Sequence, residues 1–414
     1  MAKVRRGCAP AIFLILLVVG SVAGFFGWRW YKERQPPPPS GKELRVFVLD
    51  VGPTDGDSIL IISPEDKTVV IDAGDVNRGK KTVEALKKIG IQRVDYFIAT
   101  HTHADHIGGA PDVLNSLPIG TVIDNGQQPP EVQPEAPAES ADQGKGKGKK
   151  PVPKPTPRPP RGGQREPLTV ITYRNYKDAV QASGAKYEKF PPEPKQEATP
   201  EDEKGKQKAP PPPEMKIDLG GGAFLTLIAP VQPFFTRDQM REGGNEPNAN
   251  SIVARLDYGD FSMLLAGDAE VQTEARLLSK EMNVSAKILK VAHHGSKYAT
   301  SEDFIKAVKP EAAIISDGEY NRYGHPSQSV LDRLKAANVK LYRTDLQGQI
   351  EITTTGQLKN GRLYEIKTEK EAKTDVWAGR EGQYDDSSRR GFIAYGDFGP
   401  PPKPAKEKTT TKKK

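Results

Sequence analysis

The six histidines of this 414-residue chain stand in three short clusters, and their placement limits the possible folds more than any other feature. Each cluster follows an apolar segment with the composition of a β-strand, or lies in a loop beyond one. A single histidine is usually interpreted as a structural residue of the core. That interpretation does not explain why all six histidines stand in such clusters. The pattern therefore indicates a fold that brings the ends of several strands together in one site. The clusters are His101, His103 and His106; His293 and His294; and His325.

The first cluster lies in the run HTHADHIGG, which follows the apolar segment VDYFIA. His101 and His103 are two residues apart in an extended turn, so their side chains can point the same way. Asp105 and His106 open the next segment, where we expect a helix N-terminus, and point elsewhere. Imidazole and carboxylate groups suit zinc and similar metals, and four such ligands close together in sequence can serve two adjacent ions.

Apolar runs of strand length are interleaved with segments of helical spacing, which predicts an α/β layered fold. Residues 68–72 read TVVID and are apolar on both sides, so we expect this strand to be central and buried. The other expected strands span residues 44–50, 58–62, 94–99, 119–124, 224–228, 251–257, 261–266, 287–292, 312–316, 340–343 and 349–353. The expected helices span residues 80–89, 176–183, 269–282, 301–308 and 328–337.

Composition separates a globular part from low-complexity segments. Only 36% of the residues are hydrophobic, and most of the 37 prolines stand in four stretches, at 36–39, 129–167, 191–213 and 400–404. A single cysteine, Cys8, excludes a disulfide scaffold, and a single long apolar run excludes a multi-span membrane protein. The expected segments are a stub and membrane anchor at 1–35, a Pro-rich spacer at 36–43, a globular domain at 44–367 with disordered inserts at about 127–167 and 191–213, and a polar basic tail at 368–414.

The apolar run at residues 9–28 is long enough to cross a bilayer. We expect it to be an uncleaved single-pass anchor, with the globular part outside the cytoplasm. The alternative is a signal peptide cleaved after Ser21-Val22-Ala23, which would make the protein secreted.

The net charge of +7 comes largely from lysine and arginine in the low-complexity segments. These segments could attract nucleic acid, anionic lipid or an acidic polymer. The other interpretation is a solvated linker that repels itself. No obligate protein partner is inferred.

The run His101-x-His103-x-Asp105-His106 is similar to the signature of the metallo-β-lactamase fold superfamily. More narrowly, the chain resembles the soluble metallo-hydrolase domain of ComEC-type competence proteins. The matching phrases occur in the same order and cover roughly residues 44–355, apart from the two inserts. They are LDVG, GDS, IDAG, the HTHADHIGG run, LAGD, LKVAHHGS, NRYGHP and YRTD.

The resemblance implies a four-layer αββα sandwich with two divalent metal ions at one edge. The ligands that it implies are His101 and His103 for the first ion, Asp105, His106 and His293 for the second, and Asp268 between the two. His294 could be the ligand in place of His293. Asp72 would sit behind the site and orient a ligand.

The chain departs from the superfamily pattern before the expected strand at 251–257. Many members have a further metal-binding histidine there, whereas this chain reads GGNEPNANS. Asn250 or Asn248 could be a weak ligand or hold a metal-bound water, so the choice between zinc and manganese stays open.

Two adjacent metal ions can activate a water near neutral pH and clamp the oxygens of a phosphoryl group. We expect Asp105 to orient the attacking oxygen and His325 to act as general acid or to stabilise the transition state. Lys290, Ser296 and Arg322 are candidates for contacts with phosphate. The expected activity is that of a metal-dependent phosphodiesterase or nuclease. The alternatives are a lactonase or β-lactamase-like hydrolase and a non-catalytic polyanion-binding module.

Overall fold

The computed structural model describes residues 40–54, 56–132, 166–193, 213–240, 245–321 and 323–380. The predicted anchor at 9–28 and most of the two predicted inserts and the tail lie outside these ranges. In the described ranges, no helix has both the length and the apolar character needed to cross a membrane.

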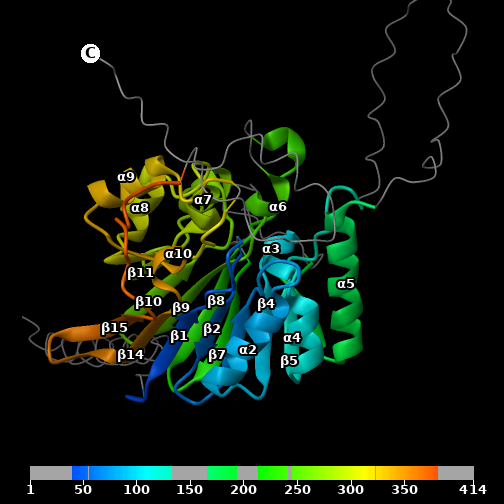
Figure 1. Cartoon of the computed structure of the whole chain (residues 1–414), viewed down its shortest axis with the longest axis horizontal. Helices are drawn as coiled ribbons and strands as arrows, with labels where there is room; N and C mark the ends of the chain where they lie inside the picture. Colours follow the sequence, from blue (N-terminus) through cyan, green and yellow to red (C-terminus); the bar gives the residue numbers. More distant parts are fainter. Residues whose placement is uncertain are drawn as a thin grey trace, which may run out of the picture.

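Two β-sheets form the centre of the molecule, as the predicted layered fold requires (Figure 1). The eight strands of the first sheet, in spatial order, are β15 (Arg362–Thr368), β14 (Ile350–Lys359), β1 (Leu44–Val48), β2 (Ile59–Ile62), β3 (Thr68–Ile71), β4 (Val94–Ala99), β5 (Ile119–Asp124) and β6 (Lys186–Lys189). The seven strands of the second sheet are β13 (Lys340–Arg343), β12 (Ala312–Ile315), β11 (Ile288–Lys290), β10 (Phe261–Leu265), β9 (Val253–Tyr258), β8 (Ala223–Ala229) and β7 (Met215–Gly220).

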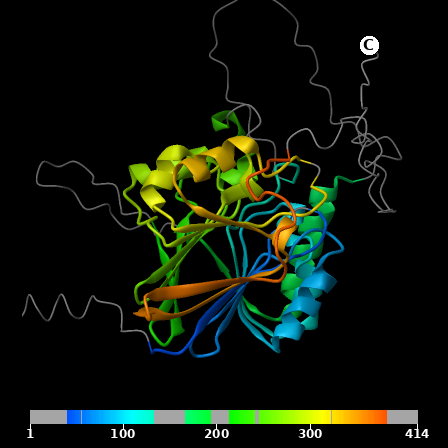
Figure 2. The ribbon, with the colours of Figure 1, turned by 60° about the vertical axis from the view of Figure 1, so that its left-hand side comes forward.

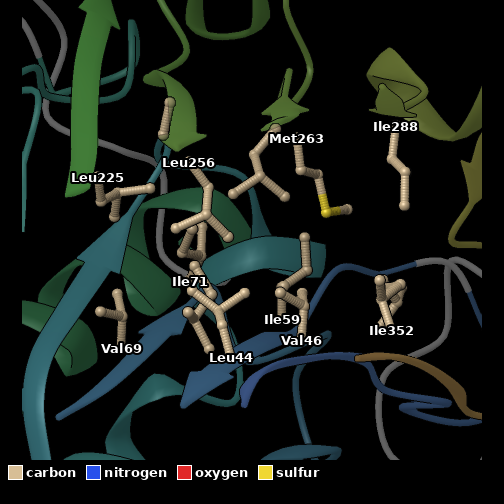
Figure 3. Packing of buried hydrophobic residues seen from close by; sticks show 14 of the residues in the cluster. Leu44, Val46, Ile59, Val69, Ile71, Leu225, Leu256, Met263, Ile288 and Ile352 are labelled. Atoms are coloured by element: carbon tan, nitrogen blue, oxygen red, sulfur yellow. The ribbon is translucent and has the colours of Figure 1, made fainter. Parts of the chain in front are cut away.

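The main hydrophobic core lies between the two sheets. Figure 3 shows Val46, Ile59 and Ile71 of the first sheet packed towards Leu256 and Met263 of the second. The central strand β3 is buried at all four positions, as its apolar run predicts. Burial of a side chain of this size contributes about 1.5–3 kcal/mol, so this layer fixes how the two sheets face each other.

Helices cover the outer face of each sheet and give four layers (Figures 1 and 2). Those packed on the first sheet are α2 (Gly79–Ile89), α4 (Ala110–Ser116) and α5 (Leu168–Ser183). Those on the second sheet are α7 (Val271–Ser279), α8 (Glu302–Val308) and α9 (Gln328–Ala336). The short helices are α3 (Ala104–Ile107), α6 (Glu246–Ala249) and α10 (Thr344–Gln347), with 3-10 turns at η1 (Arg237–Gln239) and η2 (Ala292–Gly295).

Helix α2 shows how the sequence sets one outer layer. Val83 and Leu86 stand three residues apart on one helix face, and both are buried against the first sheet. The helix ends at Gly90, whose φ of 102° is a left-handed conformation that glycine adopts without strain.

The parallel parts of both sheets place loops at one edge of the sandwich. Strand β3 pairs in parallel with β4, and β10 pairs in parallel with β11. The carboxyl ends of parallel strands meet at the same edge of a sheet. The histidine clusters follow β4 and β11, so the topology brings them to that edge.

Three edge strands were not predicted, because their burial is too weak to leave an apolar pattern. Strands β6 and β15 have no fully buried residue, and β7 has only two. The segment from residue 369 to Arg380 also packs on the domain, although a polar tail was expected from 368. Arg343 donates from its guanidinium to the carbonyls of Val376 and Ala378, at 3.0 and 2.7 Å.

Candidate metal centre

One group of possible ligands comprises His101, His103 and Asp268, whose ligand atoms all lie within 4.8 Å of one another. The two histidines follow β4, and the aspartate follows β10 in the opposite sheet. The hydroxyls of Thr100 and Ser251 lie 3.1 and 3.2 Å from His101 Nδ1. These contacts fix the ring and leave Nε2 to face Asp268.

A second group shares Asp268 and adds Asp105, His106 and His294, again within 4.8 Å of one another. His106 Nε2 lies 3.3 Å from Asp268 Oδ1. His294 Nε2 lies 3.4 Å from Asp105 Oδ2 and 3.7 Å from Asp268 Oδ1. Asp268 therefore stands between the two groups, in the position predicted for a bridging carboxylate.

Asp72 lies directly behind His106, where the sequence analysis placed it. Its carboxylate accepts a hydrogen bond from His106 Nδ1 at 2.7 Å, and two more from the backbone amide and hydroxyl of Thr100, at 2.8 and 2.7 Å. A hydrogen bond at Nδ1 turns Nε2 towards the site, which is how ligand histidines are oriented in metal proteins.

The backbone of the η2 turn decides between the two neighbouring histidines. His293 and His294 both have positive φ, of 50° and 51°, which turns their side chains in different directions. His294 points inward, and its Nδ1 lies 2.9 Å from the carbonyl of Ser316. His293 lies nearer the rim, where its Nε2 is 3.1 Å from the amide nitrogen of Asn248 and 3.8 Å from Asp268 Oδ2, and it belongs to neither ligand group. The structure thus brings the alternative, His294, into the second group in place of the first choice, His293.

Two glycines let the first histidine loop approach the rest of the domain. A Cβ atom on Gly108 would lie 2.3 Å from the backbone nitrogen of Val76, and one on Gly109 would lie 2.1 Å from the carbonyl oxygen of Ala73. Neither distance is compatible with a side chain. The glycines of HTHADHIGG are therefore required for this close packing.

The chemistry of the donor set fits divalent cations. The Nε2 atoms of His101, His106 and His294 and the Oδ1 atom of Asp268 are buried and form no hydrogen bond among the described residues. Buried polar atoms normally have partners, because an unpaired one costs about 1–3 kcal/mol. Four such atoms converging on one place form a cluster that can bind metal, since imidazole and carboxylate groups suit zinc or manganese.

The pKa values of the site residues are shifted because several titratable side chains are buried close together. Burial lowers the pKa of His101, and the neighbouring His106 lowers it further. Burial also opposes protonation of His294, but the carboxylates of Asp268, Asp57 and Asp105 outweigh it and raise its pKa to about 9. Without metal, the carboxylates are therefore balanced by imidazolium groups, so binding of cations has to displace protons.

The site has a buried floor and a more open rim. The side chains of His101, His106, His294 and Asp268 are 0 to 2% exposed. Asp105 is 24% and His293 18% exposed, and His103 and His325 are partly exposed. Asp105 and His325, the two residues predicted to take part in the reaction, are therefore both accessible from solvent.

His325 lies at this rim, although it belongs to neither ligand group. Its ring centroid is 5.3 Å from that of His293 and 6.3 Å from that of His294. Burial, with the two neighbouring histidines, lowers its pKa to about 3. It is therefore a neutral imidazole at neutral pH. Its single N–H group can donate a hydrogen bond, but the ring is not protonated at both nitrogens.

Asn250 is not placed as a ligand, contrary to one of the options drawn from the sequence. Its side-chain amide donates to the carbonyl of Phe235 at 2.9 Å and accepts from the Phe235 amide at 2.8 Å. Asn248, the other option, lies beside His293, and its Oδ1 atom is buried without a hydrogen bond in the described chain.

Lys290 is not placed to bind phosphate. Its side chain is fully buried, and its ammonium group lies 2.8 Å from the carboxylate of Asp57, which is 2% exposed. Asp57 in turn lies 3.5 Å from His294 Nδ1. Ser296 is also buried, directly after the η2 turn, and Arg322 lies outside the described residues. The sequence analysis assigned no role to Asp57; its position in GDS, before a fully apolar strand, was the available signal.

Comparison with known proteins confirms the resemblance. The profile of the Metallo-beta-lactamase superfamily matches residues 51–213, a segment that includes the first histidine cluster. It is 42% identical over 104 residues to ComE operon protein 3 of Bacillus subtilis and 37% identical over 107 residues to competence protein ComA of Neisseria gonorrhoeae. It is also 40% identical over 108 residues to recombination protein 2 of Haemophilus influenzae. These are ComEC-type competence proteins.

Each match covers a limited part of both partners. The three matched segments span 25 to 26% of this chain, and 13%, 16% and 13% of the relatives in the same order. A solved structure described as a new diphosphatase from the PhnP family covers 72% of this chain and 94% of its own, with 13% identity and a TM-score of 0.35.

Proposed function

We propose that this protein is a metal-dependent phosphodiesterase that acts on nucleic acid. One observation carries the proposal: Asp268 belongs at once to a group with two histidines and to a group with two histidines and an aspartate. Such an arrangement suits two neighbouring cations, which together lower the pKa of a water and neutralise the oxygens of a phosphodiester.

Two side chains of the protein would hold and orient the substrate's reacting atoms. Asp105 is partly exposed beside His294 and can accept a hydrogen bond from the attacking oxygen. His325, neutral at the rim, can donate a hydrogen bond to a phosphoryl oxygen that gains charge in the transition state. Thr100 keeps the histidine loop in place through its two hydrogen bonds to Asp72.

Nucleic acid is favoured over other phosphodiesters by two observations. The net charge of +7 favours an anionic polymer. Two of the relatives are named for competence and recombination, which are processes of DNA. The anchor at residues 9–28 and a position outside the cytoplasm stay predictions.

The test is hydrolysis by the full chain, purified in detergent and loaded with manganese or zinc. We expect cleavage of bis-p-nitrophenyl phosphate and single-stranded DNA, and none of nitrocefin. Asp105→Asn should lose this activity, while Asp257→Asn, a carboxylate paired with Arg255 on β9, should keep it. Cleavage of nitrocefin alone would favour a β-lactamase-like hydrolase. Metal binding without cleavage of any substrate would favour a binding module.

A further inference from the structure

Three aromatic rings form a column that leads from the metal centre towards solvent. The rings of His294 and His325 are stacked, with an interplanar angle of 18°. The rings of His325 and Tyr323 are also stacked, with centroids 5.9 Å apart and an angle of 24°. The inner end of the column is a member of the second ligand group.

The outer end of the column is exposed. Tyr323 is 56% accessible, and it is one of the few large hydrophobic side chains that the described residues leave exposed. Tyr320, in the same loop, is another, at 41%. The Tyr323 side chain, which stacks on His325 at the rim, is therefore accessible to solvent beside the candidate metal centre.

The loop that carries Tyr323 is held in place before any substrate arrives. The Asn321 amide donates to the carboxylate of Asp317 and to the carbonyl of His325, and its oxygen accepts from the Tyr323 amide at 2.8 Å. Arg380 donates to the carbonyl of Glu319 from the C-terminal segment. A preorganised ring loses little freedom on binding.

We propose that Tyr323 is a stacking platform for a nucleobase of a single-stranded substrate, next to the phosphodiester held at the metal centre. This inference rests on the proposed function and names its substrate class. Every base has a π-face, so stacking on an aromatic ring binds single strands with little dependence on sequence. A duplex keeps its bases stacked inside and offers no such face to the ring, so single strands should be preferred.

The experiment measures binding rather than cleavage. Fluorescence anisotropy of the full chain in EDTA would compare a labelled thymidine oligomer with the same backbone lacking its bases. Wild type should bind the thymidine oligomer more tightly. Tyr323→Ala should weaken that binding by roughly 5- to 150-fold, which is the range for loss of one stacked base. Binding of the base-free oligomer should change by less than about twofold, since only the stacking contact is lost.

Three further variants separate stacking from general effects. Tyr323→Phe keeps the ring and should bind like wild type, whereas Tyr323→Leu keeps bulk without an aromatic face and should bind like Tyr323→Ala. Leu358→Ala removes another exposed apolar side chain, 69% accessible in the β14–β15 hairpin, and should change nothing.

Equal losses for both oligomers, or a loss in Tyr323→Phe as large as in Tyr323→Leu, would overturn the inference. Hydrolysis of methyl p-nitrophenyl phosphate by the manganese-loaded wild type, measured separately, tests the proposed function. A protein that hydrolyses this base-free ester but shows no base-dependent binding retains the proposed function and loses the platform.

Discussion

The two ligand groups that share Asp268 differ in how firmly the protein holds them. In the second group, His106 and His294 are almost fully buried, and their Nδ1 atoms are bonded to a carboxylate and to a backbone carbonyl. In the first group, His101 contacts only hydroxyls at Nδ1, and His103 is partly exposed. The first group also has three members against four.

For the proposed two-ion centre, the difference predicts two positions of unequal affinity. A ligand that is oriented in advance loses less freedom when the ion binds, and each further ligand adds affinity. We therefore expect the ion held by Asp105, His106, Asp268 and His294 to bind more tightly than the ion held by the other group.

Asp268 is the residue on which both groups depend, so its loss should have the largest effect. We expect Asp268→Ala to retain neither ion and to hydrolyse phosphodiesters no faster than the background rate. Elemental analysis and an assay with bis-p-nitrophenyl phosphate would measure this. Retention of both ions at wild-type affinity would show that the two groups do not share a ligand.

Lys290 and Asp57 form a buried ion pair next to His294 of the second group. Loss of this pair should mainly lower the free energy of unfolding of the protein. Lys290→Met leaves the Asp57 carboxylate buried without its cation, which should cost about 3–5 kcal/mol in the free energy of unfolding. The double variant with Asp57→Asn should recover most of this loss. Urea denaturation would measure it. A change in KM without a change in stability would instead make Lys290 a substrate contact.

Single histidine variants should separate the two positions. We expect His294→Ala to lose the tight ion and His103→Ala to lose the weak one. Competition with a chelator, followed by elemental analysis, would give the stoichiometry and the order of loss. If His103→Ala lost the tightly bound ion first, the ranking of the two groups would be reversed.

Asp72 should give the smallest of these effects, because it acts through His106. Asp72→Asn keeps one acceptor oxygen but removes the charge, and should weaken the tight ion by about 10- to 100-fold. Calorimetric titration with zinc would measure both ions. The larger loss should fall on the tight ion, and an equal loss at both positions would mean that Asp72 supports the whole loop rather than one histidine.

The HTHADHIGG run was sufficient to predict where the site lies. The spacing of His101 and His103 against Asp105 and His106 predicted two groups, and the structure separates them in this way. The buried strand β3 and the helix α2 were also predictable, because their apolar periods are clear.

The remaining site residues depend on backbone geometry that local sequence does not reveal. The choice of His294 over its neighbour depends on two successive positive φ angles. The roles of Asn250 and Lys290 depend on which distant residues they meet, namely Phe235 and Asp57. A polar side chain near a ligand motif can equally be a structural hydrogen-bonding group, and only the tertiary contacts distinguish the two.

The most direct test of a shared two-ion centre is anomalous diffraction from crystals grown with manganese. We predict two peaks, one beside His101 and His103 and the other beside Asp105, His106 and His294, with the carboxylate of Asp268 contacting both. A single peak, or a peak bound by His293 in place of His294, would contradict this arrangement.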